Sequence, residues 1–391
     1  MKIKLIATAV AGIFGFQTAA AFAQSSSVRL YGTIDIEYGY LDQGIGTTGP
    51  RPSVDMMQVP LSNIGFRGEE KLTGNMSAWF QCESTADIRG VSQAGFCSRN
   101  SAVGLKGGLG NIFMGRWDTP FKRTMLPTSF VGANVVGLWG STFLLTAGST
   151  STLDGSSRAL FQRRQSNTIN YDSPIWNGIQ VMAAVSSTNG ATSATVAATA
   201  AKPRLWSLGA QYMVGPLYIS GAYEKHNQFG AIGGANDDSG WHLGAAYTFM
   251  NKMKLAAFYT QQKFETSATT ESKINAWQLG MDWNIAGPHG LLASYTATGD
   301  VKGNSTTTIA GSGATRPAAL NLVSGVLVSG DTGAELWTLR YRYQFSKRTQ
   351  TFGGYARLNN DARAAYTLGG LSGASTGNKQ DGWGVGLRHR F

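Results

Sequence analysis

Long apolar runs are missing from this chain, apart from one at its N-terminus. The rest of the 391 residues contains no segment that could cross a membrane as a helix. Charged residues make up only 14% of the chain and prolines number only 10, whereas glycines number 51. No linker-like stretch divides the sequence. We therefore expect one continuous domain over residues 24–391.

Residues suited to catalysis or metal binding are also scarce. Only four histidines are present, and none lies in an H-E-x-x-H motif or in a Cys/His metal spacing. The glycine-rich stretch at 230–234 is not followed by the Gly-Lys-Ser of a phosphate-binding loop. We therefore expect no enzyme activity, no metal site and no cofactor.

The first 23 residues have the pattern of a signal peptide. Lys2 and Lys4 precede a mostly apolar stretch at 5–16, and Ala21-Phe22-Ala23 is an A-x-A cleavage site. The alternative is a membrane-anchoring helix, but this stretch is too short to span a bilayer comfortably. We expect cleavage before Gln24 and export to a compartment where disulfides can form.

Basic residues outnumber acidic ones, and the formal net charge is +11. Without Lys2 and Lys4, 31 basic residues remain against 22 acidic ones. Such an excess suits nucleic acid, an anionic membrane surface or anionic solutes. Export argues against nucleic acid as a partner. Because the chain has no polybasic block, we expect the charges to be dispersed along strands and one loop.

Alternation of apolar and polar residues is the dominant pattern. In the last segment Trp383, Val385, Leu387, His389 and Phe391 take one face, and glycine or arginine mostly takes the other. About sixteen segments share this pattern, and many have the roughly ten residues that a tilted strand needs to cross a bilayer. The predicted strands lie near 27–40, 59–70, 74–86, 97–107, 110–117, 163–172, 178–188, 203–213, 217–226, 239–249, 253–264, 273–284, 289–299, 334–345, 349–359 and 381–391.

Connections between the predicted strands alternate between short and long. Seven short turns and eight long loops predict an up-and-down meander with both chain ends on the short-turn side. This is the plan of an outer-membrane β-barrel, whose apolar faces meet lipid and whose polar faces line a wet lumen. A Greek-key sandwich would not sort its loops in this way. Trp and Tyr recur at the ends of the apolar faces, which is typical of the aromatic girdles of a barrel.

Several segments resemble the general porins of Gram-negative bacteria, most closely those of β-proteobacteria. The resemblance covers the mature chain, and the segments that carry it together are 27–32 with Asp35, 64–70, 103–107, Gly115-Arg116 with Thr119-Pro120, 170–174 and 386–391.

This resemblance implies a homotrimeric transmembrane barrel in the outer membrane, in contact with lipid and lipopolysaccharide. It implies passive diffusion of small hydrophilic solutes through a water-filled channel, narrowed by an inward-folded third loop. It also implies that Phe391 ends an assembly signal for the barrel-assembly machinery. At Asn63 the family often carries a basic residue that points into the pore, and its absence bears on the strength of a basic constriction.

The predicted third loop, 118–162, is far longer than a usual connection. Its centre, 130–145, is too apolar to stay solvated on an outer surface, so we expect it to pack against the inner barrel wall. Basic residues dominate around this loop, and basic side chains in a confined pore favour anions. The predicted constriction residues are Arg67, Arg116, Lys122, Arg123, Arg158, Arg163 and Arg164.

A second basic set follows from strand alternation, because a charge facing lipid at mid-bilayer would cost about 2–4 kcal/mol. Inward, lumen-lining side chains are therefore predicted for Arg340, Arg342, Arg357, Arg388 and Arg390. The predicted acidic counterparts across the lumen are Asp35, Glu69 and Glu83.

Cys82 and Cys97 are the only cysteines, with 14 residues between them. Alternation puts both on the outward face of adjacent strands, around the loop at 87–96. In an oxidising compartment we expect a structural disulfide worth roughly 3 kcal/mol.

Other functions fit parts of the pattern. A solute-specific channel with a saturable site is the main alternative to an anion-preferring general porin. An outer-membrane hydrolase would need a nucleophile and a base near one rim. A surface adhesin would use the external loops, but those at 189–202 and 300–333 are rich in Ala, Ser, Thr and Gly, which is typical of variable solvated tips.

Overall fold

The structure is a computed structural model. It describes residues 27–47, 49–91, 95–130, 145, 148–149, 159–187, 203–228, 237–306, 309–311, 314–316, 321–323, 326–328, 330–368 and 375–391. The predicted signal peptide, Arg158 and most of the apolar centre of the third loop lie outside the described residues.

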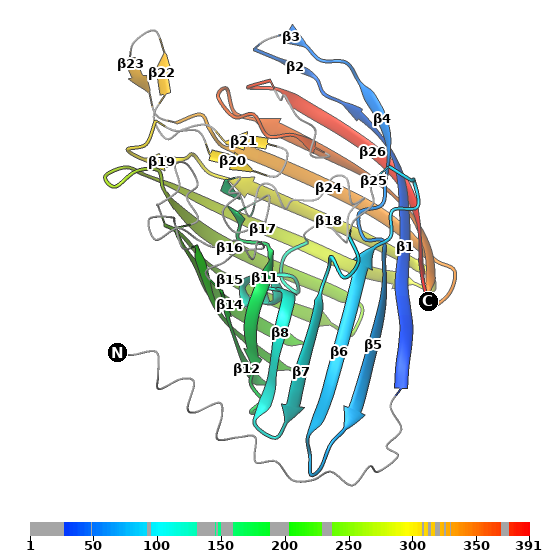
Figure 1. Ribbon diagram of the computed structural model, residues 1–391. Helices are drawn as coiled ribbons and strands as arrows, with labels where there is room; N and C mark the ends of the chain where they lie inside the picture. The colour runs from blue at the N-terminus through cyan, green and yellow to red at the C-terminus, as the bar shows by residue number, and fades with distance from the viewer. Residues whose placement is uncertain are drawn as a thin grey trace.

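Sixteen antiparallel strands form a closed barrel (Figure 1). The sheet contains 18 hydrogen-bonded segments, but β4 and β5 are two halves of one spanning strand and β19 is a two-residue external segment. The spanning segments are β1 (Ser27–Asp42), β4 (Val54–Gln58), β5 (Asn63–Lys71), β6 (Ser77–Thr85), β7 (Ser101–Gly107), β8 (Gly110–Asp118), β11 (Arg164–Asp172), β12 (Ile179–Ser186), β13 (Arg204–Val214), β14 (Leu217–Asn227), β15 (Asp238–Phe249), β16 (Met253–Glu265), β17 (Glu271–Ala286), β18 (His289–Thr298), β24 (Ala334–Gln344), β25 (Thr349–Asn360) and β26 (Lys379–Arg390).

The long loops carry the remaining described elements, and among the described residues no helix is long and apolar enough to cross a membrane. These elements are helix α2 (Pro120–Met125) and the short strands β2 (Ile45–Gly46), β3 (Gly49–Pro50), β9 (Gly148–Ser149), β10 (Ala159–Leu160), β19 (Lys302–Gly303), β20 (Ile309–Gly311), β21 (Ala314–Arg316), β22 (Asn321–Val323) and β23 (Val326–Val328).

The first and last strands close the barrel, as β1 (blue) and β26 (red) show in Figure 1. Their register runs from Thr33 opposite Arg390 to Asp42 opposite Asp381. Gly32 and Phe391 continue it with two backbone hydrogen bonds, 3.2 and 3.1 Å long. The other strands pair with their sequence neighbours, so the predicted sixteen-strand meander is confirmed.

The second strand differs from its prediction, because it is broken between β4 and β5. Pro60 lies in the break and has no N–H to donate to a sheet. Ser62 Oγ compensates by accepting from the backbone N–H of Asp35 and donating to the Asp35 carbonyl, both at 2.9 Å. The side-chain hydroxyl thus replaces a pair of ladder bonds at this point.

Apolar side chains cover the outside of the barrel and polar ones fill the inside. Leu279 and Leu339 on the outer face are 53% and 48% exposed, whereas Gln278 and Thr296 on the inner face are at most 1% exposed. A water-soluble sandwich would show the reverse arrangement. The outside therefore suits acyl chains, and the inside suits water and ions.

Glycines on the inner wall make room for loop 3, which we define as residues 119–163. Gly209 on β13, Gly244 on β15 and Gly280 on β17 face residues of this loop. A Cβ atom at Gly280 would overlap the ring of Phe130, and one at Gly244 would overlap the side chain of Thr128. The described segment 120–130 of the loop therefore lies directly against the wall, and the packing predicted for the apolar centre lies almost wholly outside the described residues.

Replacing Gly280 with valine should push Phe130 and its loop toward the pore axis. We expect a lower single-channel conductance in planar bilayers and a loss of stability of about 1–3 kcal/mol from overpacking. Gly353→Val is the matched control, because the Cβ atom there would meet Val385 at an ordinary 3.6 Å. Equal conductance for Gly280→Val and Gly353→Val would contradict the packing of loop 3 against Gly280.

Candidate functional site: the pore constriction

Helix α2 opens loop 3 and carries two of its basic residues. Thr119 caps the helix by accepting from the Lys122 N–H, and Pro120 occupies the first turn, where its missing N–H costs nothing. Phe121, Thr124 and Met125 are buried, and their spacing places them on one face of the helix. Because that face meets the wall, the side chains of Lys122 and Arg123 stay partly exposed.

Polar side chains of the wall hold the loop backbone. Ser207 Oγ on β13 accepts from the Phe121 N–H at 3.1 Å, and Ser220 Oγ on β14 donates to the Thr124 carbonyl at 2.8 Å. Further along, Gln278 Oε1 on β17 accepts from the Phe130 N–H at 2.6 Å. These bonds satisfy loop backbone groups that would otherwise be buried without partners.

A group of charged side chains gathers where α2 begins, and we name it the constriction cluster. Asp118 accepts from Lys122 Nζ at 2.7 Å and lies 3.3 Å from Arg164 Nε. Arg99 and Glu83, 2.6 Å apart, lie within electrostatic reach of the same group. Three cations therefore face two carboxylates, which leaves a positive excess.

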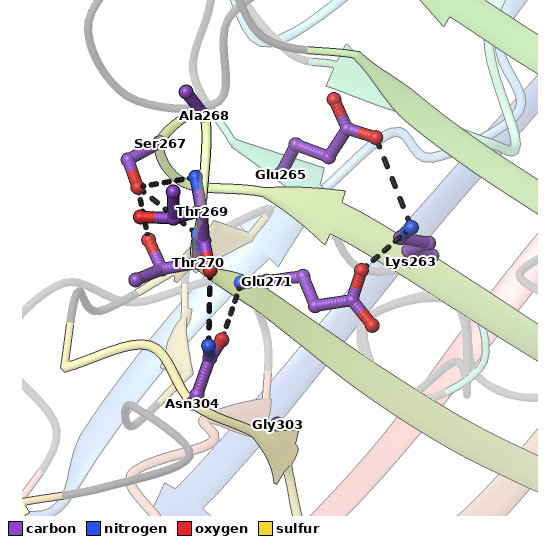
Figure 2. Close-up of a pocket in the computed structure, with 9 residues that line it drawn as sticks. All are labelled: Lys263, Glu265, Ser267, Ala268, Thr269, Thr270, Glu271, Gly303 and Asn304. Atoms are coloured by element: carbon purple, nitrogen blue, oxygen red, sulfur yellow. Dashed lines mark hydrogen bonds and ion pairs between the residues drawn. The ribbon is translucent and has the colours of Figure 1, made fainter.

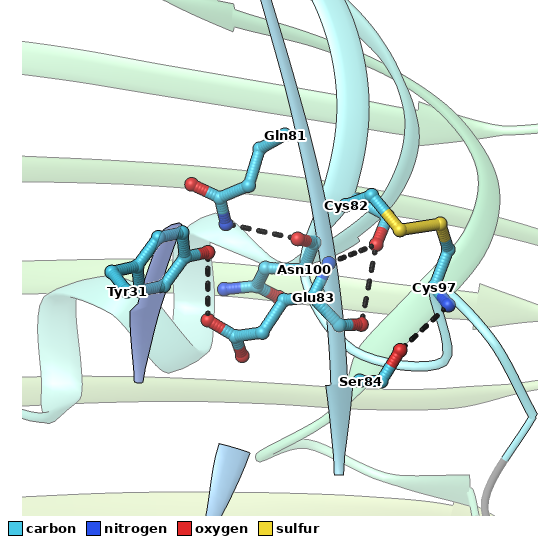
Figure 3. The surroundings of a disulfide bond; sticks show 8 residues. Tyr31, Gln81, Cys82, Glu83, Ser84, Cys97 and Asn100 are labelled. Carbon is cyan, nitrogen blue, oxygen red and sulfur yellow. Dashed lines mark hydrogen bonds between the residues drawn. A yellow bond between two sulfur atoms is a disulfide. The ribbon is translucent and has the colours of Figure 1, made fainter. Parts of the chain in front are cut away.

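Arg99 is held in place by the disulfide between Cys82 and Cys97, shown with its neighbours in Figure 3. The Cα atoms of the two cysteines are 4.8 Å apart. Two residues after Cys97, the Arg99 N–H donates to the Glu83 carbonyl at 2.8 Å. The next residue, Asn100, donates to Asp118 and accepts from Arg164. The disulfide thus lies directly before Arg99 and Asn100, the two residues of this segment that contact the constriction cluster.

Two predicted constriction residues instead anchor loop 3. Arg123 makes a two-pronged ion pair with Asp172 on β11, with both N···O distances at 2.7 Å. Arg163 is only 4% exposed and lies in the field of Glu224 and Asp238 on the opposite wall strands. Their positive charges are offset by wall carboxylates, so neither adds to the excess in the pore.

The other predicted constriction residues have separate locations. Arg67 lies over the ring of Tyr31, with its guanidinium carbon 5.2 Å from the ring centre. Both Arg67 and Arg99 lie within electrostatic reach of the Tyr31 hydroxyl. Arg116 takes the strand face of Met114, which is exposed on the outer surface, and donates to Ser166 Oγ at 2.7 Å. Arg116 nevertheless lies within electrostatic reach of Asp118 and Arg164, so its charge adds to the positive field at the cluster. Arg158 lies outside the described residues.

Arg340 and Arg388 lie on the inner face, where alternation predicts them, but both are at most 4% exposed. Arg388 pairs with Asp35 at 2.7 Å. Arg340 stacks 4.1 Å from the ring centre of Phe352 and lies in the field of Glu37. The charges of Arg340 and Arg388 are therefore offset by nearby carboxylates, and these residues stabilise the barrel wall more than they add positive charge to the pore.

The remaining residues of the second basic set divide between the two faces. Arg342 faces inward and pairs with Asp282 at 2.5 Å, and Arg390 lies opposite the inward Thr33.

Arg357 requires a correction. It lies opposite Trp337, which is 53% exposed on the outer face, so Arg357 faces outward. It pairs there with Asp381 at 3.7 Å, near the strand end, where a charge on the lipid side costs only about 0–1 kcal/mol.

The predicted acidic counterparts pair along their own wall. Glu69 lies 2.6 Å from Lys106, Glu83 lies next to Arg99, and Asp35 holds Arg388. None of these three ion pairs reaches across the lumen.

The external rim carries a different balance of charge. A recess of about 490 Å³ lies between loop residues of β16–β17 and β19, where Lys263 bridges Glu265 and Glu271 (Figure 2). Elsewhere on this rim, burial raises the pKa of Asp361, and the neighbouring carboxylates of Asp300 and Asp331 raise it further. The positive charge of the molecule is therefore not spread evenly, because carboxylates gather at parts of this rim.

Sequence reasoning missed Arg99, because alternation around residue 99 assigns it to an outward strand position. The available signal was its place two residues after Cys97: closing a disulfide to Cys82 carries residue 99 beside Glu83. The predicted lumen-lining set also lacks four inward residues near the short turns: Arg29, which alternation places on the polar face of its strand, and Lys71, Trp79 and Lys106.

The sequence pattern of the Gram-negative porin family matches residues 7–363. The chain belongs to this family. It is 28% identical to outer membrane porin protein 32 of Delftia acidovorans and 25% identical to an outer membrane porin protein of Bordetella pertussis, each over 100% of both chains. Among solved structures, the anion-selective porin from Comamonas acidovorans has the same fold, with a TM-score of 0.73 and 24% identity over 94% of this chain and 100% of that one.

This porin therefore forms a water-filled diffusion channel in the outer membrane of a Gram-negative bacterium. The expected resemblance to β-proteobacterial porins is confirmed. The polar interior and the inward third loop described above are the physical basis of the channel.

Removing the disulfide should loosen the constriction cluster. In the double variant Cys82→Ser/Cys97→Ser we expect a smaller reversal potential in a KCl gradient, because Arg99 is no longer held against Glu83. We also expect a loss of about 3 kcal/mol of stability, as for a cross-link that closes a loop of this size. An unchanged reversal potential in a correctly folded double variant would show that the segment is ordered without the cross-link.

Proposed function

We propose that this porin passes small hydrophilic anions in preference to cations. The observation that carries the proposal is a continuous run of basic side chains along one wall. It starts at the constriction cluster, passes through Arg67 and ends near the short turns. The cations are Arg164, Lys122, Arg99, Arg67, Arg29, Lys71 and Lys106, and the carboxylates among them are Asp118, Glu83 and Glu69.

The position of this run makes its charge effective. The described segment 120–130 of loop 3 lies against the wall formed by β13–β17, so ions must pass between this segment and the strands that carry the run. The barrel wall and surrounding lipid have a low dielectric constant and concentrate the field in the remaining water. An anion therefore meets a favourable electrostatic potential from the constriction cluster to the short-turn end of the pore.

One solved structure of the same fold supports the same preference. The Comamonas acidovorans protein of the same fold is described as anion-selective. Asn63, at the position where the family resemblance implies a basic residue, donates to the Leu61 carbonyl at 2.8 Å and adds no charge. Arg99 supplies a cation to the same region from a different segment of the chain.

The reversal potential of the purified porin in a planar bilayer under a KCl gradient tests this proposal. We expect the sign that marks chloride as the more permeant ion. Lys122→Gln should lower the chloride-to-potassium permeability ratio about threefold, because a unit charge about 6 Å from an ion contributes about 0.7 kcal/mol even in a water-like medium.

Lys302→Gln is the matched control for this experiment. Lys302 is an exposed external lysine, and its loss should leave the permeability ratio unchanged. A cation-preferring wild-type channel would overturn the proposed function. An effect of Lys302→Gln equal to that of Lys122→Gln would instead assign selectivity to the overall charge of the protein.

We further propose that the porin is a homotrimer whose 1–23 segment is a cleaved leader. A trimer form is described for OmpT of Vibrio cholerae, whose fold matches with a TM-score of 0.64 at 14% identity. The exposed apolar belt would meet outer-membrane lipid and lipopolysaccharide. The terminal Phe391, paired with Gly32 at the closure seam, would be the signal for the barrel-assembly machinery.

Electrophoresis in SDS tests the oligomer. An unheated sample should migrate near three times the 41.5 kDa of the full chain, less the leader, and a boiled sample should migrate as the monomer. An unheated band at the position of a folded monomer would contradict the trimer.

A further inference from the structure

A recess of about 620 Å³ lies on the inner wall near the short-turn mouth of the barrel. Side chains of β1, β5, β6, β7 and β8 line it, and the charged ones are Arg29, Arg67, Lys71, Lys106 and Glu69. By the outer-membrane plan, short turns face the periplasm, so we name this space the periplasmic recess. Its volume is within the range of small-molecule sites and is much larger than one chloride ion requires.

The periplasmic recess contains several cationic side chains, and at least one of them is held in a fixed orientation. Glu69 is the only carboxylate among its lining residues, and it is paired with Lys106 at 2.6 Å. Because Glu69 offsets the charge of Lys106, the three charges of Arg29, Arg67 and Lys71 remain in excess. Arg67 is oriented by the ring of Tyr31, 5.2 Å away. A carboxylate or another compact anionic group is the natural partner for such donors.

An aromatic surface lies beside these cations. Trp79 lines the recess and packs against Phe113 and Trp117, with ring centres 5.4 and 5.7 Å away. Its indole N–H donates to Asn111 Oδ1 at 2.7 Å, which fixes the orientation of the ring. A small inorganic anion gains nothing from packing against a rigid indole, whereas a flat organic ring packs well against one.

We propose that the periplasmic recess is a saturable binding site for small aromatic carboxylates. The ring of the solute packs against Trp79, and its carboxylate contacts the cations Arg29, Arg67 and Lys71. This inference rests on the proposed anion preference, because the solute must enter the same basic pathway. It goes further by giving the channel a preferred class of organic solute.

Block of chloride current tests the site. Benzoate, added in increasing concentration to single channels in a KCl bilayer, should reduce chloride conductance along a saturating curve. Acetate, which has the same charge but no ring, should show no saturation over the same range. Trp79→Leu should raise the half-saturating benzoate concentration about 2- to 10-fold, the value of an aromatic contact of about 0.5–1.5 kcal/mol.

A charge variant tests the same site without disturbing the aromatic packing. Arg29 and Lys71 are exposed, so Arg29→Gln/Lys71→Gln should fold normally and should also raise the half-saturating concentration at least threefold. The matched control is Lys252→Gln/Lys347→Gln. It removes two exposed charges from short turns after β15 and β24, outside the recess, and should leave benzoate block unchanged.

The outcomes separate this inference from the proposed function. Cation preference in the KCl gradient would overturn the proposed function. An anion-preferring channel in which benzoate does not saturate, or saturates no better than acetate, would overturn the aromatic-carboxylate site alone. Equal benzoate block in the wild type and in Arg29→Gln/Lys71→Gln would do the same, even if Trp79→Leu failed to fold.

Discussion

Backbone pairing between β1 and β26 is the interaction on which this porin depends. In hydrocarbon an unpaired N–H or C=O group costs several kcal/mol, so a sheet that spans the membrane must have no free edge. The seam runs from the pairing of Gly32 with Phe391 to that of Asp42 with Asp381. Once it is closed, each inward side chain faces water or loop 3, and this is what allows arginines and carboxylates within the membrane.

Closure also makes the two halves of the interior different. The wall formed by β13–β17 is lined by glycines and hydroxyl groups, and loop 3 occupies it. The wall formed by β1 and β5–β8 keeps its cations in water. Charges that meet the loop or lie deep in the wall, such as Arg163 and Arg388, are compensated by carboxylates, since an unpaired buried charge would be very costly. Net positive charge therefore remains where solutes pass.

Local pattern predicted the faces of most strand residues because the side-chain period of a strand is two residues. Asp35, Arg340 and Arg388 lie on the inner face for that reason. Alternation fails where a strand stops being regular. The register between β8 and β11 shifts near Asn167, close to Arg116, and Arg357 lies far enough toward the strand end for an outward charge to be tolerated.

The sequence by itself determined the barrel, its strand number, its loop order and its lipid-facing surface, because each follows from short-range alternation and from turn composition. Only the tertiary structure decided which cations act together. Arg99 reaches Glu83 through a cross-link, Arg123 pairs with Asp172, 49 positions away along the chain, and Trp79 lies beside cations from three other strands. Such groupings depend on register and loop packing between distant segments, and no local pattern records them.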